Sequence, residues 1–302
     1  MLALLQRITT FLTLATAVGW LAYFGRSAPM LAWAGCAVLV FGYSALFALE
    51  FVIASQINRQ DPTDRAGWRD HFAAWWGETL IAPRVFCWRQ PFRPNAVADH
   101  LEPQKKVWGR RGVVFVHGFF CNRGFWTPWL ECLQSRGNAF IAVDLEPLFG
   151  SIDSYAAQID EAIKQVTRAT GLAPLLVCHS MGGLAARAWL KRIKHQDHVH
   201  HVVTIGTPHR GTWLARFGHG ENSRQMRLAS SWYAEFSQAT FPGRQLPFTC
   251  WYSNCDNIVF PASNATLPGA CNRLLHGVGH VQMAFLPEVM QATWDLLDDN
   301  PP

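Results

Sequence analysis

Two long apolar stretches open the chain, at Ile8–Phe24 and Leu31–Ser55. Each is long enough to cross a hydrocarbon layer of about 30 Å as a helix. The connection between them, Gly25–Met30, is too short for anything but a tight turn. The pattern therefore predicts a transmembrane helical hairpin in residues 1–56, with both of its ends on the same side of the bilayer.

Charged residues around the hairpin indicate which side that is. Arg7 precedes the first stretch, and Arg59, Arg65 and Arg69 follow the second, whereas Arg26 is alone in the connection. Lysine and arginine concentrate on the cytoplasmic side of a membrane. We therefore expect both ends of the hairpin, and the rest of the chain, in the cytoplasm.

A cleaved signal peptide is the alternative interpretation of the first stretch, with Arg7 as its basic start and Ala15-Thr16-Ala17 as its cleavage site. The apolar run continues past that site and a second stretch follows, which favours the hairpin. Glu50 is the one charged residue in the second stretch. A functional carboxylate within the membrane is one alternative for it. Because it lies near the end of the stretch, we expect it instead to reach the membrane interface.

Residues 57–111 form a segment that is rich in tryptophan and arginine. We expect a helix at Ala66–Leu80, and two positions for it are open: against the bilayer, where tryptophan concentrates, or packed by the same rings on the domain that follows. Four basic residues close the segment, either as a contact for an anionic lipid surface or as a solvated loop. They are Lys105, Lys106, Arg110 and Arg111.

After Gly112 short apolar runs alternate with stretches of helical periodicity. Buried strands joined by helices are typical of a parallel sheet that is covered on both faces. We therefore expect an α/β domain, a mostly parallel sheet with helices on both faces, in residues 112–302. The expected strands are Val113–Val116, Ala139–Val143, Leu175–Cys178, Val199–Ile205 and Phe248–Tyr252. The expected helices are Tyr155–Thr170, Gly182–Lys194 and Pro287–Leu297.

Composition excludes some functions. The formal net charge is +5, but the basic residues are scattered and not interleaved with aromatic ones, so no nucleic acid is expected as a partner. Of the eight cysteines, Cys36 lies in the hairpin and the others show neither a regular framework nor a CxxC pair. This favours reduced thiols and gives no support for a structural zinc site.

Ser180 carries the functional interpretation. The run Leu175–Cys178 ends in His179-Ser180-Met181-Gly182-Gly183, and a helical stretch follows. A serine on such a strand-to-helix turn has its hydroxyl exposed above the sheet, and the residues two positions away must be small. The pattern predicts a nucleophile elbow in which Cys178 replaces the usual first glycine and Gly182 keeps the second.

A serine nucleophile needs a base that is oriented by an acid, and in this arrangement the acid and then the histidine follow the serine along the chain. Asp256 comes just after the last expected strand, and His280 follows Gly277-Val278-Gly279. We expect His280 to be the base and Asp256 to accept a hydrogen bond from it. The less favoured candidates are Asp153, Asp197 and His276.

Acyl transfer also requires N–H groups that point at the developing oxyanion. We expect Met181, the residue after the nucleophile, to supply one of them. Phe119 is expected to supply the second, because the run Val113–Val116 leads into His117-Gly118-Phe119. His117 itself is expected to stabilise this loop by hydrogen bonding and not to act as a base.

These motifs together resemble those of a known protein family. From Val113 to about Phe285 the chain resembles the bacterial triacylglycerol lipases of the α/β-hydrolase superfamily. The similarity lies in the His117-Gly118 loop, the elbow, the segment Thr204–Thr212, and the acid and histidine segments. It implies an α/β-hydrolase fold without the superfamily's first strands, a triad of Ser180, His280 and Asp256, and an oxyanion hole at Phe119 and Met181.

Together with the hairpin, the resemblance implies a location in the bacterial inner (cytoplasmic) membrane. Those lipases often bind a structural calcium ion through a carboxylate near the catalytic histidine. Here Val281 and Gln282 follow His280. We therefore expect no metal ion and no cofactor.

A cap is expected at residues 213–245, a long segment rich in aromatic residues. An apolar lid over Ser180 favours acyl chains, so we expect a lipid or other hydrophobic ester as the substrate, with a smaller ester as the alternative. A histidine cluster at the amino end of a strand is expected to be a solvated loop and not a metal site. It comprises His195, His198, His200 and His201.

The predicted function is that of a membrane-anchored serine ester hydrolase, a lipase or carboxylesterase that acts through an acyl-enzyme. Two alternatives remain open. An acyltransferase or thioesterase would use the same triad. A catalytically silent hydrolase fold would serve as a membrane scaffold, but it would have no need for the serine, the acid and the histidine together.

Overall fold

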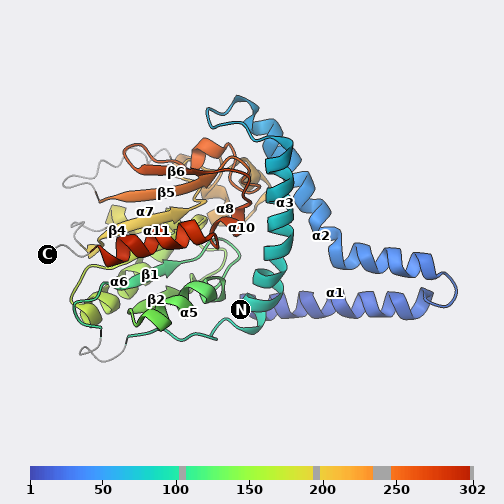
Figure 1. Cartoon of the computed structure of the whole chain (residues 1–302), viewed down its shortest axis with the longest axis horizontal. Coiled ribbons are helices and arrows are strands. Elements are labelled where there is room, and N and C mark those ends of the chain that lie inside the picture. Colours follow the sequence, from blue (N-terminus) through green and yellow to red (C-terminus); the bar gives the residue numbers. More distant parts are fainter. Residues whose placement is uncertain (102–106, 193–197, 234–245, 300–302) are drawn as a thin grey trace.

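A parallel sheet forms the centre of the computed structural model, which describes residues 1–101, 107–192, 198–233 and 246–299 (Figure 1). Within these residues six strands pair in the order β2-β1-β3-β4-β5-β6, and every pairing is parallel. The strands are β1 (Val113–Val116), β2 (Phe140–Val143), β3 (Leu175–His179), β4 (His201–Ile205), β5 (Phe248–Ser253) and β6 (Cys271–Leu275). The α/β fold expected from the sequence is thus confirmed.

Helices cover both faces of the sheet, because successive side chains of a strand point to opposite faces. Val114 and Val116 of β1 pack against α6 (Ala156–Thr170) and α7 (Met181–Arg192). Val113 and Phe115 of the same strand pack on the other side, against α5 (Thr127–Arg136) and α11 (Pro287–Asp298). Such two-sided burial explains why the central strands have continuous apolar sequences.

The remaining described helices are short or belong to the N-terminal part. They are α1 (Leu2–Phe24), α2 (Pro29–Ile57), α3 (Trp68–Pro83), a π-helical turn at Arg84–Arg89, α4 (Gln90–Phe92), α8 (Glu221–Gln225) and α10 (His280–Met283). Of the expected cap, the structure describes residues 213–233, which include a 3₁₀ turn at Trp213–Phe217 and α8. Residues 234–245 of the cap, and Lys105, Lys106, His195 and Asp197, lie outside the described residues.

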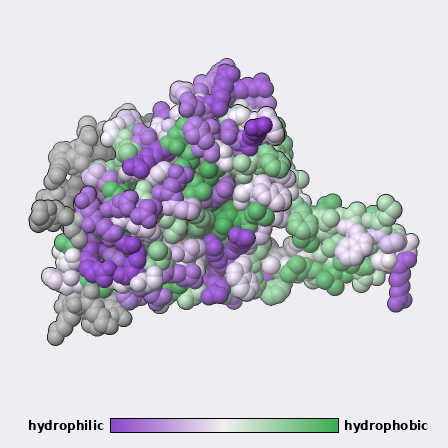
Figure 2. Space-filling model, in the orientation of Figure 1, coloured by the Kyte–Doolittle hydropathy of each residue, from purple (hydrophilic) through white to green (hydrophobic). Residues whose placement is uncertain are grey.

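The helices α1 and α2 form the expected antiparallel hairpin. It projects away from the rest of the molecule, and α2 bends partway along its length (Figure 1). The projecting part has a mostly apolar surface, apart from its hydrophilic tip (Figure 2). Both helices are long and apolar enough to cross a membrane, by length and composition, and few of their residues are buried.

The two ends of the hairpin meet the same helical segment. Near the start of α1, Gln6 Nε2 donates to Gln90 Oε1 at 3.1 Å. Along the second half of α2, Tyr43 donates to the carbonyl of Thr79 at 2.9 Å, and Trp75 Nε1 donates to the carbonyl of Ser44 at 2.8 Å. Helix α3 and its continuation therefore lie between the hairpin and the α/β domain, as Figure 1 shows.

Helix α3 confirms the helix expected at Ala66–Leu80, and its two faces differ. Ala74, Glu78 and Ala82 are buried. The opposite face carries large apolar side chains spaced four residues apart, and these are between 46% and 75% exposed. They are Trp68, Phe72, Trp76 and Leu80. The helix thus packs on the domain with one face and leaves an aromatic face, Trp68, Phe72, Trp76 and Leu80, uncovered.

Substitution of Trp129 of α5 tests the packing on the sheet face that α5 and α11 cover. The ring of Trp129 is fully buried, it makes an edge contact with Trp294 of α11 at 5.1 Å, and its Nε1 donates to the carbonyl of Ala284 at 2.8 Å. Trp129→Ala removes both contacts and leaves a cavity, so we expect a loss of about 3–5 kcal/mol in the free energy of unfolding.

Chemical denaturation of the detergent-solubilised protein measures this loss. The matched control is Trp108→Ala, because the Trp108 side chain is 61% exposed. We expect this control to lose less than about 1 kcal/mol. Equal destabilisation by both substitutions would contradict the packing described for α5 and α11.

Candidate active site

Ser180 lies on a sharp turn between β3 and α7. Its φ angle is 54°, in the left-handed region that a residue with a side chain rarely adopts. The Ser180 N–H donates to the carbonyl of Ile205 at 2.9 Å, and Thr207 Oγ1 donates to the Ser180 carbonyl at 2.9 Å. Strand β4 and the residues after it therefore hold the turn through both the N–H and the carbonyl of Ser180.

Two glycines allow the neighbouring chain to approach this turn. A Cβ atom at Gly182 would lie 2.4 Å from the carbonyl oxygen of Val116, and one at Gly118 would lie 2.7 Å from Ser180 Cβ. Neither distance is possible for a real side chain, so both positions require glycine. Cys178, which stands where the elbow usually has its first glycine, is fully buried in the core beside α7. Burial raises the pKa of its thiol, and the thiol is therefore protonated at neutral pH.

His280 and Asp256 lie together as the sequence predicts. His280 Nδ1 is 2.9 Å from Asp256 Oδ2, and both side chains are buried. The other carboxylate oxygen of Asp256 accepts hydrogen bonds from the N–H groups of Ile258 and Val259, each at 2.8 Å. Two N–H groups thus fix one oxygen of the acid, and the other oxygen is directed at the imidazole ring.

The imidazole ring of His280 lies close to the elbow. A Cβ atom at Gly206, directly after β4, would be 3.0 Å from His280 Cε1. The ring centroids of His280 and His179, the residue before Ser180, are 4.7 Å apart. Burial alone would lower the pKa of His280, but the charge and hydrogen bond of Asp256 outweigh it and raise that pKa above its ordinary value.

The less favoured candidates have other partners. His276 Nδ1 lies 3.2 Å from the side-chain amide of Asn254. Asp153 accepts hydrogen bonds from Gln225 Nε2 at 3.2 Å and from Trp232 Nε1 at 2.7 Å. Neither residue contacts Ser180 or His280 in the hydrogen bonds described.

The loop expected to complete an oxyanion hole lies against Ser180. His117 Nε2 accepts a hydrogen bond from the N–H of Leu145 at 3.1 Å, so its Nδ1 carries the proton and donates to the carbonyl of Gly118 at 2.9 Å. His117 thus stabilises the loop, as expected. Phe119 follows directly, and Met181 is the first residue of α7, where an N–H group has no partner within the helix.

Three residues that the sequence analysis did not identify hold the backbone around His280. Asn257 Oδ1 accepts from the His280 N–H at 3.2 Å, and His179 Nε2 lies 3.2 Å from the His280 carbonyl oxygen. Glu78 of α3 accepts from the next two N–H groups in the chain, those of Val281 and Gln282. His179 and Asn257 adjoin predicted residues, but nothing in the sequence near Glu78 marks it.

Glu50 of α2 has a partner in this region that the sequence did not predict. Its Oε2 accepts a hydrogen bond from Asn257 Nδ2 at 2.7 Å. The residue expected to reach the membrane interface is therefore joined to the loop that also carries Asp256.

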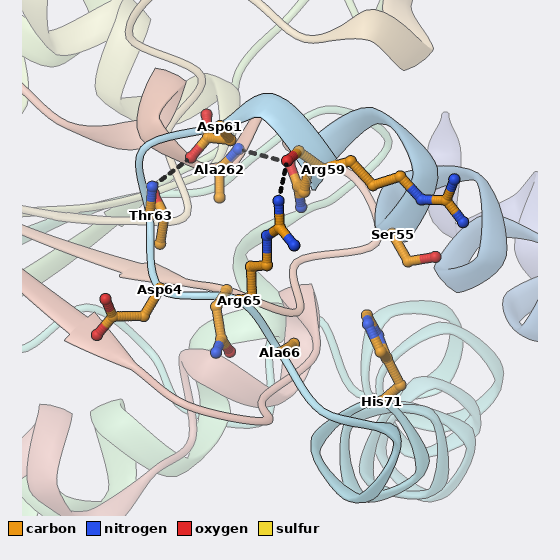
Figure 3. Close-up of a pocket in the computed structure, with 11 residues that line it drawn as sticks. Ser55, Arg59, Asp61, Thr63, Asp64, Arg65, Ala66, His71 and Ala262 are labelled. Carbon is orange, nitrogen blue, oxygen red and sulfur yellow. Dashed lines mark hydrogen bonds between the residues drawn. The ribbon is translucent and has the colours of Figure 1, made fainter.

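A polar cavity of about 220 Å³ lies beside the segment that joins α2 to α3 (Figure 3). Its walls come from the end of α2, the connection to α3 and the start of α3, together with Asn254 and Ala262. Arg65 crosses it to donate to the carbonyl of Arg59 at 3.1 Å, and the N–H of Ala262 donates to Asn58 Oδ1 at 3.0 Å (Figure 3). None of Ser180, Asp256 and His280 lines it, so it is separate from the candidate active site.

Known proteins match the α/β domain. A family model described as the alpha/beta hydrolase family matches residues 113–297. Triacylglycerol lipase 2 of Saccharomyces cerevisiae is 34% identical over 99 residues, which make up 31% of this chain and 30% of the yeast protein. The matched part is thus less than a third of that relative's length.

Two solved structures are similar in fold. The mature form of a Bacillus licheniformis lipase has a TM-score of 0.55 at 18% identity, covering 65% of this chain and 94% of that one. Aspergillus fumigatus lipase B has a TM-score of 0.59 at 18% identity, covering 68% of this chain and 56% of that one. The family model spans more than half of the chain, and the sheet and elbow agree with it: the chain belongs to the alpha/beta hydrolase family.

Proposed function

We propose that this protein is a membrane-anchored serine ester hydrolase that acts on lipid or other hydrophobic esters. The observation that carries the proposal is the pairing of His280 with a buried Asp256 at 2.9 Å beside a serine on a strained strand-to-helix turn. Similarity to proteins named as lipases supports an ester as the substrate.

The mechanism follows from these positions. Ser180 Oγ attacks the ester carbonyl carbon, and its proton passes to His280 Nε2 while Asp256 stabilises the imidazolium. The N–H groups of Phe119 and Met181 donate to the oxyanion. The leaving alcohol takes the proton from His280, and a water molecule, deprotonated by His280, then releases the acid from Ser180.

The hairpin supports the membrane part of the proposal. A buried core helix would be covered by the protein, whereas the side chains of α1 and α2 are largely exposed and apolar. The exposed aromatic face of α3 adjoins the base of the hairpin, which is where a bilayer interface would lie. The arginines on that side favour a cytoplasmic location for the α/β domain.

Covalent labelling tests the nucleophile. We expect a fluorophosphonate probe to label the wild-type protein and not Ser180→Ala, because the probe phosphorus bonds to an activated serine oxygen. Ser135→Ala is the matched control, since Ser135 is an exposed serine that donates only to the carbonyl of Cys132. Absence of labelling in the wild type, or undiminished labelling of Ser180→Ala, would refute the proposal.

Substitution of the acid tests the base. Asp256→Asn leaves His280 in the wrong tautomer, so we expect the rate of ester hydrolysis to fall about 10³–10⁴-fold. Asp153→Asn, the competing acid, should leave the rate within about twofold. A comparable loss in both variants, or a loss only in Asp153→Asn, would contradict the assignment of Asp256.

The pH profile of the wild-type enzyme gives a second measurement on the same pair. His280 acts as a base only when neutral, and its pKa is raised by Asp256. We therefore expect the rate to rise with pH through a midpoint above about 6.5, the ordinary value for histidine. A midpoint below that value would contradict the pairing.

Fractionation tests the anchor. The full chain should stay in the membrane pellet after carbonate extraction, and a reporter fused to its carboxyl terminus should be active in the cytoplasm. Release of the chain into the supernatant would show that the hairpin does not span the bilayer. Activity of the reporter only on the outer side would reverse the proposed orientation.

A further inference from the structure

The helix that begins at His280 cannot hold its own position. Helix α10 has only four residues, His280–Met283, and a helix this short is not stable by itself. Its first N–H groups also lack partners within the helix. The position of the proposed base therefore depends on groups from elsewhere in the chain.

Glu78 supplies the partners for the first of these N–H groups. Its Oε1 and Oε2 lie 3.0 and 3.1 Å from the N–H nitrogen of Val281, and its Oε2 lies 3.0 Å from that of Gln282. The side chain is 1% exposed, so water does not compete for these bonds. A carboxylate that receives N–H groups at a helix start in a water-free site makes strong, charge-assisted hydrogen bonds.

Glycines bring α3 and α10 into direct contact. A Cβ atom at Gly279 would lie 2.6 Å from Glu78 Oε2, and one at Gly77 would lie 2.2 Å from Gln282 Oε1. Gly279 thus leaves room for the Glu78 side chain, and Gly77 leaves room for the Gln282 side chain. A shift of α3 would move His280 with it.

Burial makes this carboxylate costly for the fold. Loss of water raises the pKa of Glu78 from 4.5 to about 7, against the opposing hydrogen bonds of Val281 and Gln282. Because the pKa in the folded protein is the higher one, Glu78 lowers the folding stability progressively as pH rises from about 4.5 to about 7. The charged groups that act on it are His280, which lowers its pKa, and Asp256, which raises it.

We propose that Glu78 is a positioning residue for His280: its ionised carboxylate fixes the start of α10 from the juxtamembrane helix α3. This rests on the proposed role of His280 as the base. Glu78 touches neither Ser180 nor the reacting atoms. Its negative charge also favours the imidazolium that forms when Ser180 attacks.

Glu50 supports the same assignment from a second helix. It holds Asn257, whose Oδ1 accepts from the His280 N–H. Both carboxylates precede residue 113, where the match to the family begins. Helices that lie outside the family match thus hold the segment around His280 in place.

The rate of fluorophosphonate labelling tests the proposal, since it reports the activated serine without requiring a known substrate. The full-length protein in detergent is labelled over a range of pH as the wild type, Glu78→Gln, Glu78→Asp and the control Asp70→Asn. Asp70 lies on the same helix, and its carboxylate accepts from the N–H of Gly67 at 2.8 Å. Melting temperatures are measured at pH 8 in parallel.

At pH 8 we expect Glu78→Gln to be labelled at least about tenfold more slowly, because a displaced base costs rate steeply. Its pH midpoint should lie lower, since a charge that raises the pKa of His280 is absent. Glu78→Asp keeps the charge but is shorter, so its rate should be intermediate and its midpoint that of the wild type. Asp70→Asn should behave as the wild type does.

A wild-type labelling rate in Glu78→Gln would overturn the proposal, and so would a loss of rate that follows a lower melting temperature with an unchanged pH midpoint. If Glu78→Gln does not fold, Glu78→Asp decides: a folded protein with the wild-type rate would overturn the proposal, and a slower one would support it. Failure of the wild type itself to be labelled at Ser180 would refute the proposed function instead. The two failures are therefore distinguishable.

Discussion

The turn at Ser180 exists only because three other segments of chain come into contact with it. A φ angle of 54° is unfavourable for serine, and structures of this kind persist where their surroundings over-determine them. Here Gly182 of α7 allows β1 to approach, and Gly118 allows the loop after β1 to approach Ser180. The carbonyl of Ile205 in β4 accepts a hydrogen bond from the Ser180 N–H. The order β1-β3-β4 at the centre of the sheet is what brings these segments together. Parallel pairing then directs the ends of all three strands to the same edge, where Asp256 also lies after β5.

Buried charge is the second constraint on this edge of the sheet. Asp256 is satisfied by two N–H groups and by His280, which makes its burial tolerable. Glu78 accepts only from N–H groups, and its burial in the same water-free region raises its pKa against the opposing effect of those hydrogen bonds. The two carboxylates thus differ in environment although they serve one histidine. Asp256 contacts the ring of His280, and Glu78 contacts the backbone that carries it.

The sequence predicted the parts of this site that follow local rules. Buried strands leave continuous apolar runs, and β1 was predicted with its observed ends. The elbow, the acid and the histidine follow strand ends in a fixed order, so Ser180, Asp256 and His280 could be selected from the sequence. Their geometry agrees with those roles, which remain a proposal. Phe119 and Met181 were selected on the same grounds, and their role as oxyanion donors stays a prediction.

Other elements left no local signal. The edge strand β6 begins Cys271-Asn272-Arg273, and these residues are exposed, so no apolar run marks them. Helix α5 is short, with Pro128 as its second residue, and it was not predicted. Glu78 lies 203 residues from its partner Val281. A contact over such a separation depends on how α3 packs, which composition and periodicity do not determine.

The opposite faces of α3 join an exposed apolar surface to the candidate site through one helix. Its outer face presents Trp68, Phe72, Trp76 and Leu80, and its inner face presents Glu78 to α10. A helix that is hydrogen-bonded along its length transmits displacement without bending at each residue. If the outer face rests on lipid as proposed, the bilayer contacts the same helix that orients His280. A soluble fragment beginning at residue 113 would keep Ser180, Asp256 and His280 in sequence, yet it would lack the carboxylates that hold the histidine in place.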